Sequence, residues 1–447
     1  MASIPGTHYD VFAGAQTVNF GLTADPNNIP APVPGDFNLE LITNATGTGN
    51  FATRAGYQGL AILSSGGNVL TALHGSYGIV DGGGNDLITL GDGSVSIGGA
   101  SGDTLIGGSG LNQFLDAHLG HESVIGGSSG TETIWGSGND AITGGSGGDE
   151  RIGGVAGDTI HGGTGNDFID GDRGGQSITG GSAGNETIWG GVGDTIQGGA
   201  GGNEIIGGMA GDTILGGAGN EFIDGSAGNQ SIGGGSAGNE TIWGGASDTI
   251  HGGAGGNETI GGMAGDTIVG GTGNEFIDGS GGNQSIVGGS AGNETIWGGA
   301  GDTIQGGSAG NETIAGVAHE TITGGGANAF FDATSGNESI VASSSNSTIW
   351  GGASDTIQGA PAGGSALIGF KGGSETFIDN GGGSDSISTF SQASGDLVSL
   401  NGATDAIANV VGTASTSGGD TTVTLHDGST ITFIGISSVN SSFFTTH

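Results

Sequence analysis

Hydrophobic positions recur at short intervals along most of the chain. Between residues 244 and 305 an isoleucine stands third in each of seven four-residue segments: 248–251, 258–261, 266–269, 275–278, 284–287, 294–297 and 302–305. An acid or amide opens each segment, and a glycine-rich stretch precedes it. Because side chains alternate between the two faces of a strand, each segment predicts a very short strand with its isoleucine inward and the flanking residues outward. Glycine in nearly every turn-length window excludes a helix and supplies tight turns.

A longer repeat contains the short one. Tryptophan recurs every 54 residues at positions 135, 189, 243 and 297, and Trp350 follows after 53. Phenylalanine keeps the 54-residue step at positions 114, 168, 222, 276 and 330. Such internal periodicity is typical of a repeat architecture, in which stacked units bury a continuous core. The repeated region extends over residues 81–390.

The short unit resembles the repeats-in-toxin (RTX) family, whose haemolysin-type calcium-binding nonapeptide is G-G-x-G-x-D-x-U-x. Residues 162–170 match this pattern most fully, and residues 207–215 and 261–269 match it less fully. The resemblance implies an all-β, right-handed parallel β-roll or β-solenoid, with two nonamers in each turn and Ca²⁺ between turns on both edges. Fifty-four residues then make three turns. It also implies export by type I secretion to the cell surface or the extracellular space of a bacterium.

Three regions are expected along the chain. Residues 1–80 hold five of the six prolines and form an N-terminal cap or interaction segment; residues 81–390 form the β-roll; residues 391–447 form a C-terminal β cap. Within the last region, residues 421–435 place an Asp-Gly turn between alternating runs, which predicts a hairpin. The tail at 439–444 resembles the uncleaved C-terminal signal of type I substrates, with a simple cap as the alternative. The first residues lack the basic and apolar runs of a cleavable signal.

Successive nonamers lie on opposite edges of the roll, so the turn acids sort into two rows. The Asp edge comprises Asp140, Asp158, Gln176, Asp194, Asp212, Gln230, Asp248, Asp266, Gln284, Asp302, Glu320, Glu338 and Asp355. The Glu edge comprises Glu132, Glu150, Asp167, Glu186, Glu204, Glu221, Glu240, Glu258, Glu275, Glu294 and Glu312. Carboxylates stacked about 4.8 Å apart repel by about 0.9 kcal/mol in water and about 3.5 kcal/mol at an effective dielectric of 20. Each row therefore needs counter-ions or interruptions.

Carboxylates and turn carbonyls are hard oxygen ligands that suit Ca²⁺. In the family the short Asp chelates the ion, and glutamate departs from that pattern. The predicted metal ligands are accordingly Asp140, Asp158, Asp167, Asp194, Asp212, Asp248, Asp266, Asp302 and Asp355. Glutamine at every third position should divide the ion row into pairs. The alternative is a solvated ladder without a specific ion.

Composition narrows the classes of function. The chain has 44 acidic and 4 basic residues, a net charge of −40, which repels nucleic acid and anionic membranes. Cysteine is absent, so disulfides and thiolate metal sites are excluded, and no apolar run is long enough to span a membrane. The GxSxG pattern at 288–292 recurs with the repeat and is a product of composition. We therefore expect no catalytic site.

The tryptophans are the expected interaction residues. Trp135, Trp189, Trp243, Trp297 and Trp350 each follow an inward isoleucine, so they should point outward on one sheet. They could pack against a neighbouring rod, stack on sugar rings, or be half-buried by local turns. The phenylalanine row is expected on the other sheet or edge, where it could serve in the same way.

These features favour a secreted structural protein of the cell surface or extracellular matrix. A calcium-stabilised rod would assemble with copies of itself into a layer or fibre. The alternative is a calcium-dependent adhesin or polysaccharide-binding protein, and an ice-binding protein with outward threonines ranks third.

Overall fold

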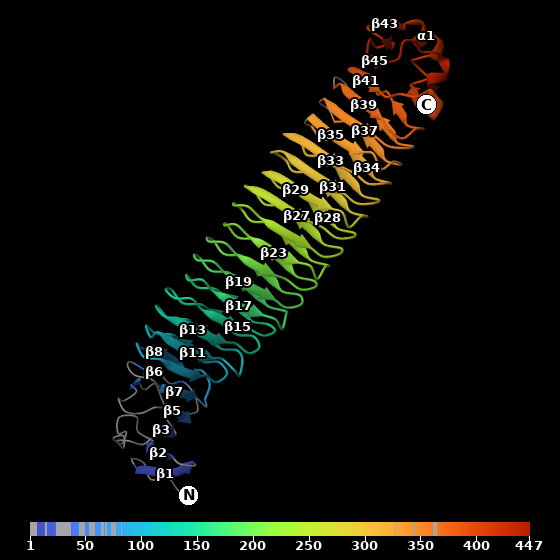
Figure 1. Cartoon of the computed structure of the whole chain (residues 1–447). Coiled ribbons are helices and arrows are strands. Elements are labelled where there is room, and N and C mark those ends of the chain that lie inside the picture. Colours follow the sequence, from blue (N-terminus) through green and yellow to red (C-terminus); the bar gives the residue numbers. More distant parts are fainter. Residues whose placement is uncertain are drawn as a thin grey trace. The chain divides into compact units, whose positions relative to one another are not determined.

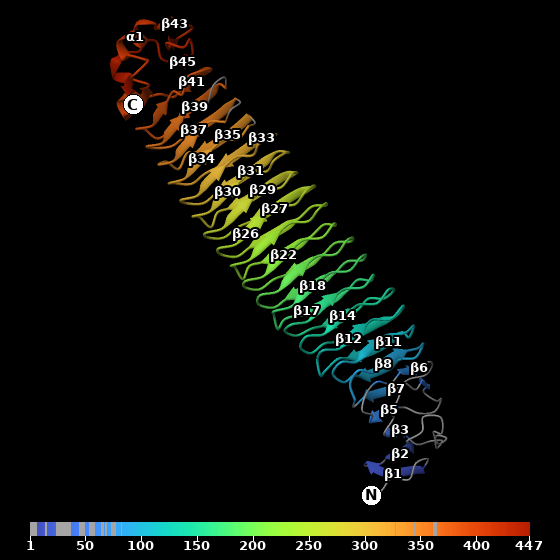
Figure 2. The same ribbon diagram turned by 180° about the vertical axis from the view of Figure 1, so that it is seen from behind.

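Eighteen residues bring the chain back to a position directly above its start. In the computed structural model Ile178 pairs with Ile196, and Ile286 with Ile304, in parallel register. Each turn contains two short strands joined by two glycine-rich turns, so stacked turns form two parallel sheets (Figures 1 and 2). The predicted parallel β-solenoid is confirmed.

The structure describes residues 83–447 except 327, 344–345 and 361–363. Before residue 83 it describes residues 7–13, 16–23, 37–43, 50–52, 59–63, 67, 69–72 and 77–81. The chain divides into two compact units, Met1–Phe222 and Ile223–His447.

The two sheets of the first unit contain alternate strands along the chain. Its first sheet comprises β1 (Thr7–Ala13), β2 (Gln16–Thr23), β3 (Phe37–Thr43), β5 (Gly59–Leu63), β7 (Tyr77–Asp81), β9 (Val95–Gly98), β11 (Asn112–Asp116), β13 (Thr131–Trp135), β15 (Arg151–Gly153), β17 (Phe168–Gly171), β19 (Thr187–Gly190) and β21 (Ile205–Gly207). Its second sheet comprises β4 (Asn50–Ala52), β6 (Val69–Ala72), β8 (Leu87–Leu90), β10 (Thr104–Ile106), β12 (Ser123–Ile125), β14 (Ala141–Thr143), β16 (Thr159–His161), β18 (Ser177–Thr179), β20 (Thr195–Gln197) and β22 (Thr213–Leu215).

Strand β23 (Phe222–Gly225) lies where the units divide. In the second unit the first sheet comprises β25 (Thr241–Gly244), β27 (Asn257–Gly261), β29 (Asn274–Gly279), β31 (Glu294–Gly298), β33 (Asn311–Ala315), β35 (Asn328–Ala333), β37 (Ser347–Gly351), β39 (Ala366–Phe370), β41 (Ser384–Ser388), β43 (Ser415–Ser417), β44 (Asp420–Thr424) and β45 (Thr430–Phe433). Its second sheet comprises β24 (Ser231–Gly233), β26 (Thr249–His251), β28 (Thr267–Val269), β30 (Ser285–Val287), β32 (Thr303–Gln305), β34 (Thr321–Thr323), β36 (Ser339–Val341), β38 (Thr356–Gln358), β40 (Thr376–Ile378), β42 (Leu397–Leu400) and β46 (Phe444–Thr446). The helices are η1 (Gln392–Ser394), α1 (Ile407–Gly412) and η2 (Ser441–Phe443).

A ladder of isoleucines forms the core of each unit. Ile188 and Ile206 in the first unit, and Ile296 and Ile314 in the second, are fully buried. Burying one such side chain contributes about 1.5–3 kcal/mol. The same alternation turns the acid two residues before each isoleucine inward, so every turn of the stack buries carboxyl or amide groups at its edges.

Glycine is required where successive turns touch. Gly202 has φ of 95°, and a Cβ there would stand 1.4 Å from the carbonyl oxygen of Gly184 in the neighbouring turn. Only glycine, which has no Cβ, tolerates this left-handed conformation together with so close an approach. The glycine content of the chain therefore reflects close stacking of backbone on backbone.

The C-terminal region closes its unit as a cap. Strands β44 and β45 form the predicted antiparallel hairpin. The tail of the chain is built into this cap: β46 pairs with β42, and Phe443 stacks on Phe390 with ring centroids 4.9 Å apart. The segment that resembles a secretion signal is thus packed in the folded chain.

About half of the expected N-terminal cap or interaction segment, residues 1–80, lies outside the described residues. Strands β1 and β2 are antiparallel, whereas β2 with β3, β3 with β5, and β5 with β7 are parallel. Parallel stacking is thus present before residue 81, and the boundary at residue 80 stays a prediction. Within the described part of the chain, no helix is long and apolar enough to cross a membrane.

Candidate metal-binding edges and tryptophan face

Aspartates on the Asp edge hold the backbone of their own turns. Asp194 accepts a hydrogen bond from the N–H of Gly191 at Oδ2, over 2.7 Å. The backbone N–H of Asp194 in turn donates to Oδ1 of Asp212 in the next turn, over 2.8 Å. Asp212 receives its second bond from Met209, over 2.6 Å. Both oxygens of Asp212 are therefore engaged by backbone donors.

The same pattern covers the predicted metal ligands of this edge. The structure brings together the pairs Asp140 with Asp158, Asp194 with Asp212, and Asp248 with Asp266. Asp302 is bonded by the backbone of Gln284, and Asp355 by that of Glu338. Burial raises the pKa values of these aspartates above the ordinary value of 3.8. Their backbone hydrogen bonds oppose this shift without cancelling it.

Glutamine interrupts the Asp edge as a neutral member of the ladder. Gln176 donates from its backbone N–H to Oδ1 of Asp194, over 2.7 Å, and from Nε2 to the carbonyl of Gly171, over 2.9 Å. Gln284 repeats both bonds in the second unit, with Asp302 and Gly279. Each amide removes one buried charge from the row and donates to a carbonyl of its own turn, but among the described residues its Oε1 accepts no hydrogen bond.

Most glutamates of the Glu edge are buried without such donors, although Glu221 and Glu312 each accept one backbone N–H. Among the described residues, both side-chain oxygens lack a hydrogen-bond partner in Glu132, Glu150, Glu186, Glu204, Glu258, Glu275 and Glu294. Their exposed fractions lie between 0% and 3%. Leaving a buried polar group unsatisfied costs about 1–3 kcal/mol, and more when the group is charged. This edge therefore needs protons or cations.

Burial also raises the pKa values of glutamates on the Glu edge. Burial, with the neighbouring acids Glu221 and Glu186, raises the pKa of Glu204 to about 9. Burial together with Asp167 and Glu132 raises the pKa of Glu150 to about 10. Without a cation, a proton on Glu204 is retained at neutral pH and can be donated to the carboxylates on either side.

Backbone carbonyls complete an oxygen-lined space between turns of the Glu edge. A Cβ on Gly199 would stand 2.7 Å from Oε2 of Glu186 and 3.0 Å from Oε1 of Glu204. The carbonyl oxygen of Gly181 lies 2.9 Å from the same point. Ca²⁺ takes six to eight oxygen ligands at about 2.3–2.6 Å in flexible geometry. The donor set fits this ion, with Glu186, Glu204 and turn carbonyls as its holders.

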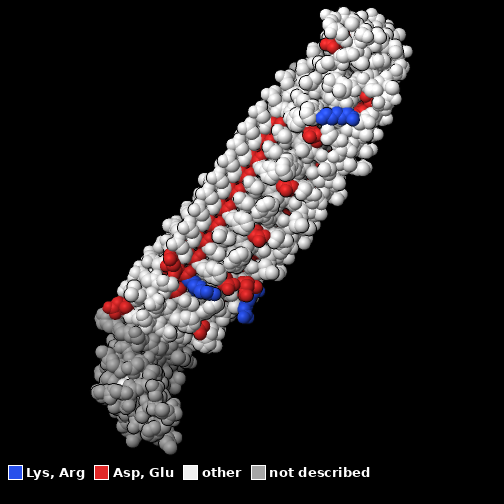
Figure 3. Space-filling model, viewed as in Figure 1, with Lys and Arg blue, Asp and Glu red and all other residues white. Residues whose placement is uncertain are grey.

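Carboxylates alone do not complete such a site. Within the described ranges, no three histidine or acidic side chains converge on one point, so a cation here must draw on carbonyls and water for its remaining ligands. Asp167, the one predicted ligand on the Glu edge, accepts N–H groups of Gly163 (2.6 Å) and Glu150 (3.0 Å). Acidic atoms are visible in Figure 3 as a narrow stripe with separate patches beside it.

The tryptophans lie on the outer face of the first sheet in each unit. Their exposed fractions lie between 37% and 50%, which confirms the outward orientation predicted from the sequence. The ring of Trp243 lies across Gly261, where a Cβ would stand 2.2 Å from Cε3. The placement of the phenylalanines on the other sheet or edge was wrong. Phe276 lies in β29, which pairs with β31 in the same sheet as the tryptophans. The ring of Phe276 contacts that of Trp297 edge-on, with 5.0 Å between the ring centroids.

A family model supports the interpretation of the repeats. The RTX calcium-binding nonapeptide repeat matches residues 152–175, 180–209, 197–229, 234–263, 260–290 and 332–359. The chain contains RTX repeats. RTX repeats bind calcium, and they are characteristic of type I secreted extracellular proteins. No curated protein matches the chain.

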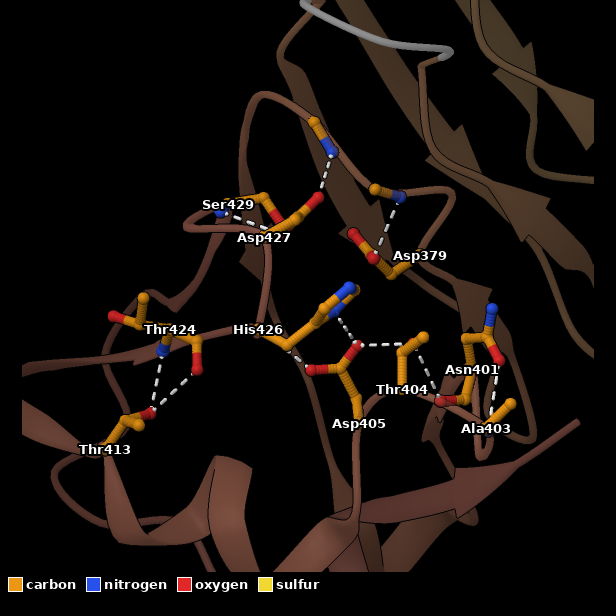
Figure 4. A network of polar contacts seen from close by, with 12 residues as sticks. Asp379, Asn401, Ala403, Thr404, Asp405, Thr413, Thr424, His426, Asp427 and Ser429 are labelled. Carbon is orange, nitrogen blue, oxygen red and sulfur yellow. Dashed lines mark hydrogen bonds and ion pairs between the residues drawn. The ribbon is translucent and has the colours of Figure 1, made fainter.

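A polar network in the C-terminal cap was missed from the sequence. Nδ1 of His426 lies 2.8 Å from Oδ2 of the buried Asp405, and the backbone N–H of His426 donates to Oδ1 (Figure 4). Thr404 donates to the same carboxylate over 3.1 Å. Asp405 and His426 are 21 residues apart and share no motif, so only the fold brings them together. The network ties the turn before α1 to the hairpin.

Proposed function

We propose that this RTX-repeat chain is a secreted structural protein of the cell surface or extracellular matrix, whose solenoid is stabilised by Ca²⁺ on the Glu edge. One observation carries the proposal: buried, unpartnered glutamate oxygens face turn carbonyls between successive coils. A cation that binds the folded state and has no preformed site in the unfolded state stabilises the fold by mass action. The aspartates of the Asp edge need no ion for their own hydrogen bonds.

Export and folding are coupled in this proposal. Where Ca²⁺ is scarce, the glutamates of the Glu edge disfavour stacking, and the chain stays unfolded for type I secretion. Where Ca²⁺ is plentiful, the turns close and the solenoid forms. The described chain is dominated by repeats and cap, which supports a role in assembly rather than catalysis, with copies of the chain associating into a layer or fibre.

Far-ultraviolet circular dichroism and sedimentation during a Ca²⁺ titration test the proposal, starting from chain treated with EDTA. We expect a cooperative gain of β signal at micromolar to millimolar Ca²⁺, followed by large assemblies. A Mg²⁺ titration is the control, because Mg²⁺ demands tighter octahedral geometry and sheds water reluctantly. A fold already complete in EDTA at neutral pH, and unchanged by Ca²⁺, would refute the metal requirement. Folding without assembly would refute the structural role alone.

A second candidate is a calcium-dependent adhesin that binds its partner through the tryptophan face. The observation that favours it is a cavity of about 440 Å³ beside the half-exposed Trp243. Replacing Trp243 and Trp297 by alanine should then abolish adhesion while the Ca²⁺-induced β signal remains. Retained adhesion in this folded double variant would remove the candidate.

A further inference from the structure

The last tryptophan of the row carries a cation from its own chain. Nζ of Lys371 lies 3.3 Å from the ring centroid of Trp350. Asp332 is the register partner of Trp350 in the neighbouring turn, and Phe330 meets the same ring edge-on at 5.3 Å. An ammonium group over an indole face is attracted by the negative face of the ring, and a nearby carboxylate adds to that attraction.

The register shows which residue takes the place of Lys371 at another tryptophan. Trp350 pairs with Gly369, and Lys371 stands two residues beyond that glycine. Trp243 pairs with Gly261, so the equivalent residue is Met263. Met263 is 52% exposed. One member of the row thus has a lysine where another has an uncharged side chain.

The site at Trp243 retains the remaining groups. Asp224 and Asp278 line the same cavity of about 440 Å³ as Trp243 and Met263. Each aspartate accepts only one hydrogen bond among the described residues, at Oδ1 from the backbone of a serine two residues later, over 3.1 Å. Their other oxygens are available to a ligand. An aromatic face between two carboxylates is a receptor for an organic cation.

We propose that the cavity at Trp243 binds the ammonium group of a lysine side chain from a partner protein, in the place that Lys371 takes at Trp350. The inference is independent of self-assembly. Lys371 is the only lysine of the chain, and it already occupies its own tryptophan, so a second copy of the chain cannot supply the group. The net charge of −40 further draws basic partners to this surface.

The spacing of the row specifies the partner further. Trp243 and Trp297 are three turns apart in the second unit, which is about 14 Å at the usual strand spacing. An extended chain advances about 3.3–3.4 Å per residue, so four residues cover the same distance. An extended segment with lysine at every fourth position would reach both rings. Binding at two sites then multiplies affinity through effective concentration.

The experiment uses the full chain with Ca²⁺ and a fluorescent peptide that carries lysine at every fourth position among glycine and serine. Anisotropy at 0.15 M salt measures its affinity. We expect at least tenfold weaker binding by a peptide with the same lysines placed consecutively, and loss of binding when the lysines are acetylated. Equal affinity for all three peptides would overturn the proposal.

Two reciprocal variants test the site itself. Met263→Lys should place the chain's own lysine on Trp243 and weaken peptide binding at least fivefold. Lys371→Met should free Trp350 and add one site to the stoichiometry. Circular dichroism verifies the fold of both. Wild-type affinity in Met263→Lys, with its fold intact, would overturn the proposal.

Charge-matched variants separate the site from general attraction to an acidic chain. Asp278→Asn should weaken binding at least threefold. Asp149→Asn removes one charge from an exposed position of the Glu-edge turns and retains the Oδ1 acceptor used by Asn166, so it should leave binding unchanged. Equal losses in the two variants would show unspecific attraction and overturn the site. Binding of neutral or amino-sugar oligomers in preference to the peptide would identify a glycan as the occupant instead.

Discussion

The two edges of this solenoid bury carboxylates at the same spacing and satisfy them differently. On the Asp edge the short side chain reaches two backbone N–H groups, as in Asp212. On the Glu edge both oxygens of Glu204 lie beside a neighbouring glutamate and turn carbonyls, without a donor. One additional methylene therefore changes a residue that fastens a turn into a residue that needs a proton or a cation.

Each edge has exceptions, and these show whether the length of the side chain or its edge decides if its oxygens have hydrogen-bond donors. Asp167 lies on the Glu edge, and both of its oxygens accept backbone N–H groups. Glu320 and Glu338 lie on the Asp edge, and none of their oxygens has a partner among the described residues. Burial raises the pKa of Glu320 to about 8, as on the Glu edge. Side-chain length accounts for these three residues but not for every glutamate, because Glu375 accepts backbone N–H groups of residues 371–373 at both of its oxygens.

The largest expected effect is that, in EDTA, the chain loses stability as pH rises, which is the reverse of the usual behaviour of carboxylates in a folded protein. Burial raises the pKa values of Glu150 to about 10, Glu204 to about 9 and Glu275 to about 8, above the ordinary value of 4.5. Between pH 4.5 and each raised pKa, the folded chain binds more protons than the unfolded chain. The contribution of these groups to the free energy of unfolding is therefore highest below pH 4.5 and falls as pH rises. Each contributes at most about 1.4 kcal/mol per pH unit.

Urea unfolding at pH 5 and pH 8, with and without Ca²⁺, measures this dependence. We expect a more stable chain at pH 5 in EDTA, and a smaller difference in Ca²⁺, because the cation replaces the protons. Higher stability at pH 8 than at pH 5 in EDTA would show that the glutamates are ionised and satisfied in the folded chain without metal.

Removing one aspartate should give the next largest effect. Asp194→Ala leaves the backbone N–H groups of Gly191 and Gln176 without their acceptor. Hydrogen bonds to a charged group contribute about 1.5–3 kcal/mol each, so we expect a loss of about 3–6 kcal/mol in the free energy of unfolding. The loss should be the same in EDTA and in Ca²⁺ at pH 5, where protons replace the cation and the chain folds in both, measured by urea unfolding. A loss that appears only in Ca²⁺ would instead identify Asp194 as a metal ligand, as the sequence suggested.

Glu204→Gln tests the other side of the comparison. The amide cannot supply the anionic oxygen that a cation between Glu186 and Glu204 requires, but its two N–H groups can donate to Glu186 and Glu221, whereas the protonated acid has one O–H to donate. We expect at least tenfold weaker Ca²⁺ binding at this site, about 1.4 kcal/mol, and a smaller loss of stability as pH rises above 5 in EDTA. Calorimetric titration measures the first and urea unfolding the second. Unchanged Ca²⁺ binding would contradict a metal role for this residue.

Periodicity was enough to predict the fold and the membership of each edge. The isoleucine ladder, the outward tryptophans and the C-terminal hairpin all follow from alternation and spacing. The phenylalanine row was misplaced, although Phe276 and Trp297 lie two segments apart and must therefore share a sheet. Counting segments instead of residues corrects this, because individual segments vary between eight and ten residues.

The chemistry of the edges could not be predicted in the same way. Sorting acids into rows requires only the repeat, but deciding which oxygens have donors requires the distance between a carboxylate and the N–H groups of its turn. Family resemblance directed the prediction towards aspartate, and the metal assignments of those aspartates stay a prediction. Each glutamate stands two residues before its isoleucine, and in a strand such residues point to the same side. The burial of Glu204 could therefore have been predicted from the sequence.

The smallest expected effect concerns the residue that fastens turns on the Glu edge in place of aspartate. Asn185 donates from its backbone N–H and from Nδ2 to Oδ1 of Asn166, over 2.9 Å and 3.0 Å, and its own Oδ1 accepts the N–H of Asn203. The exposed amides link neighbouring turns through backbone N–H groups, as the buried Asp194 does on the Asp edge. Asn185→Ala should cost about 0.5–1.5 kcal/mol, equally in EDTA and in Ca²⁺ at pH 5, because neutral exposed hydrogen bonds contribute little. Asn185→Asp retains the acceptor and should fall between the alanine variant and wild type in urea unfolding. A loss as large as that of Asp194→Ala would mean that the amide ladder, and not cation binding, holds the Glu edge together.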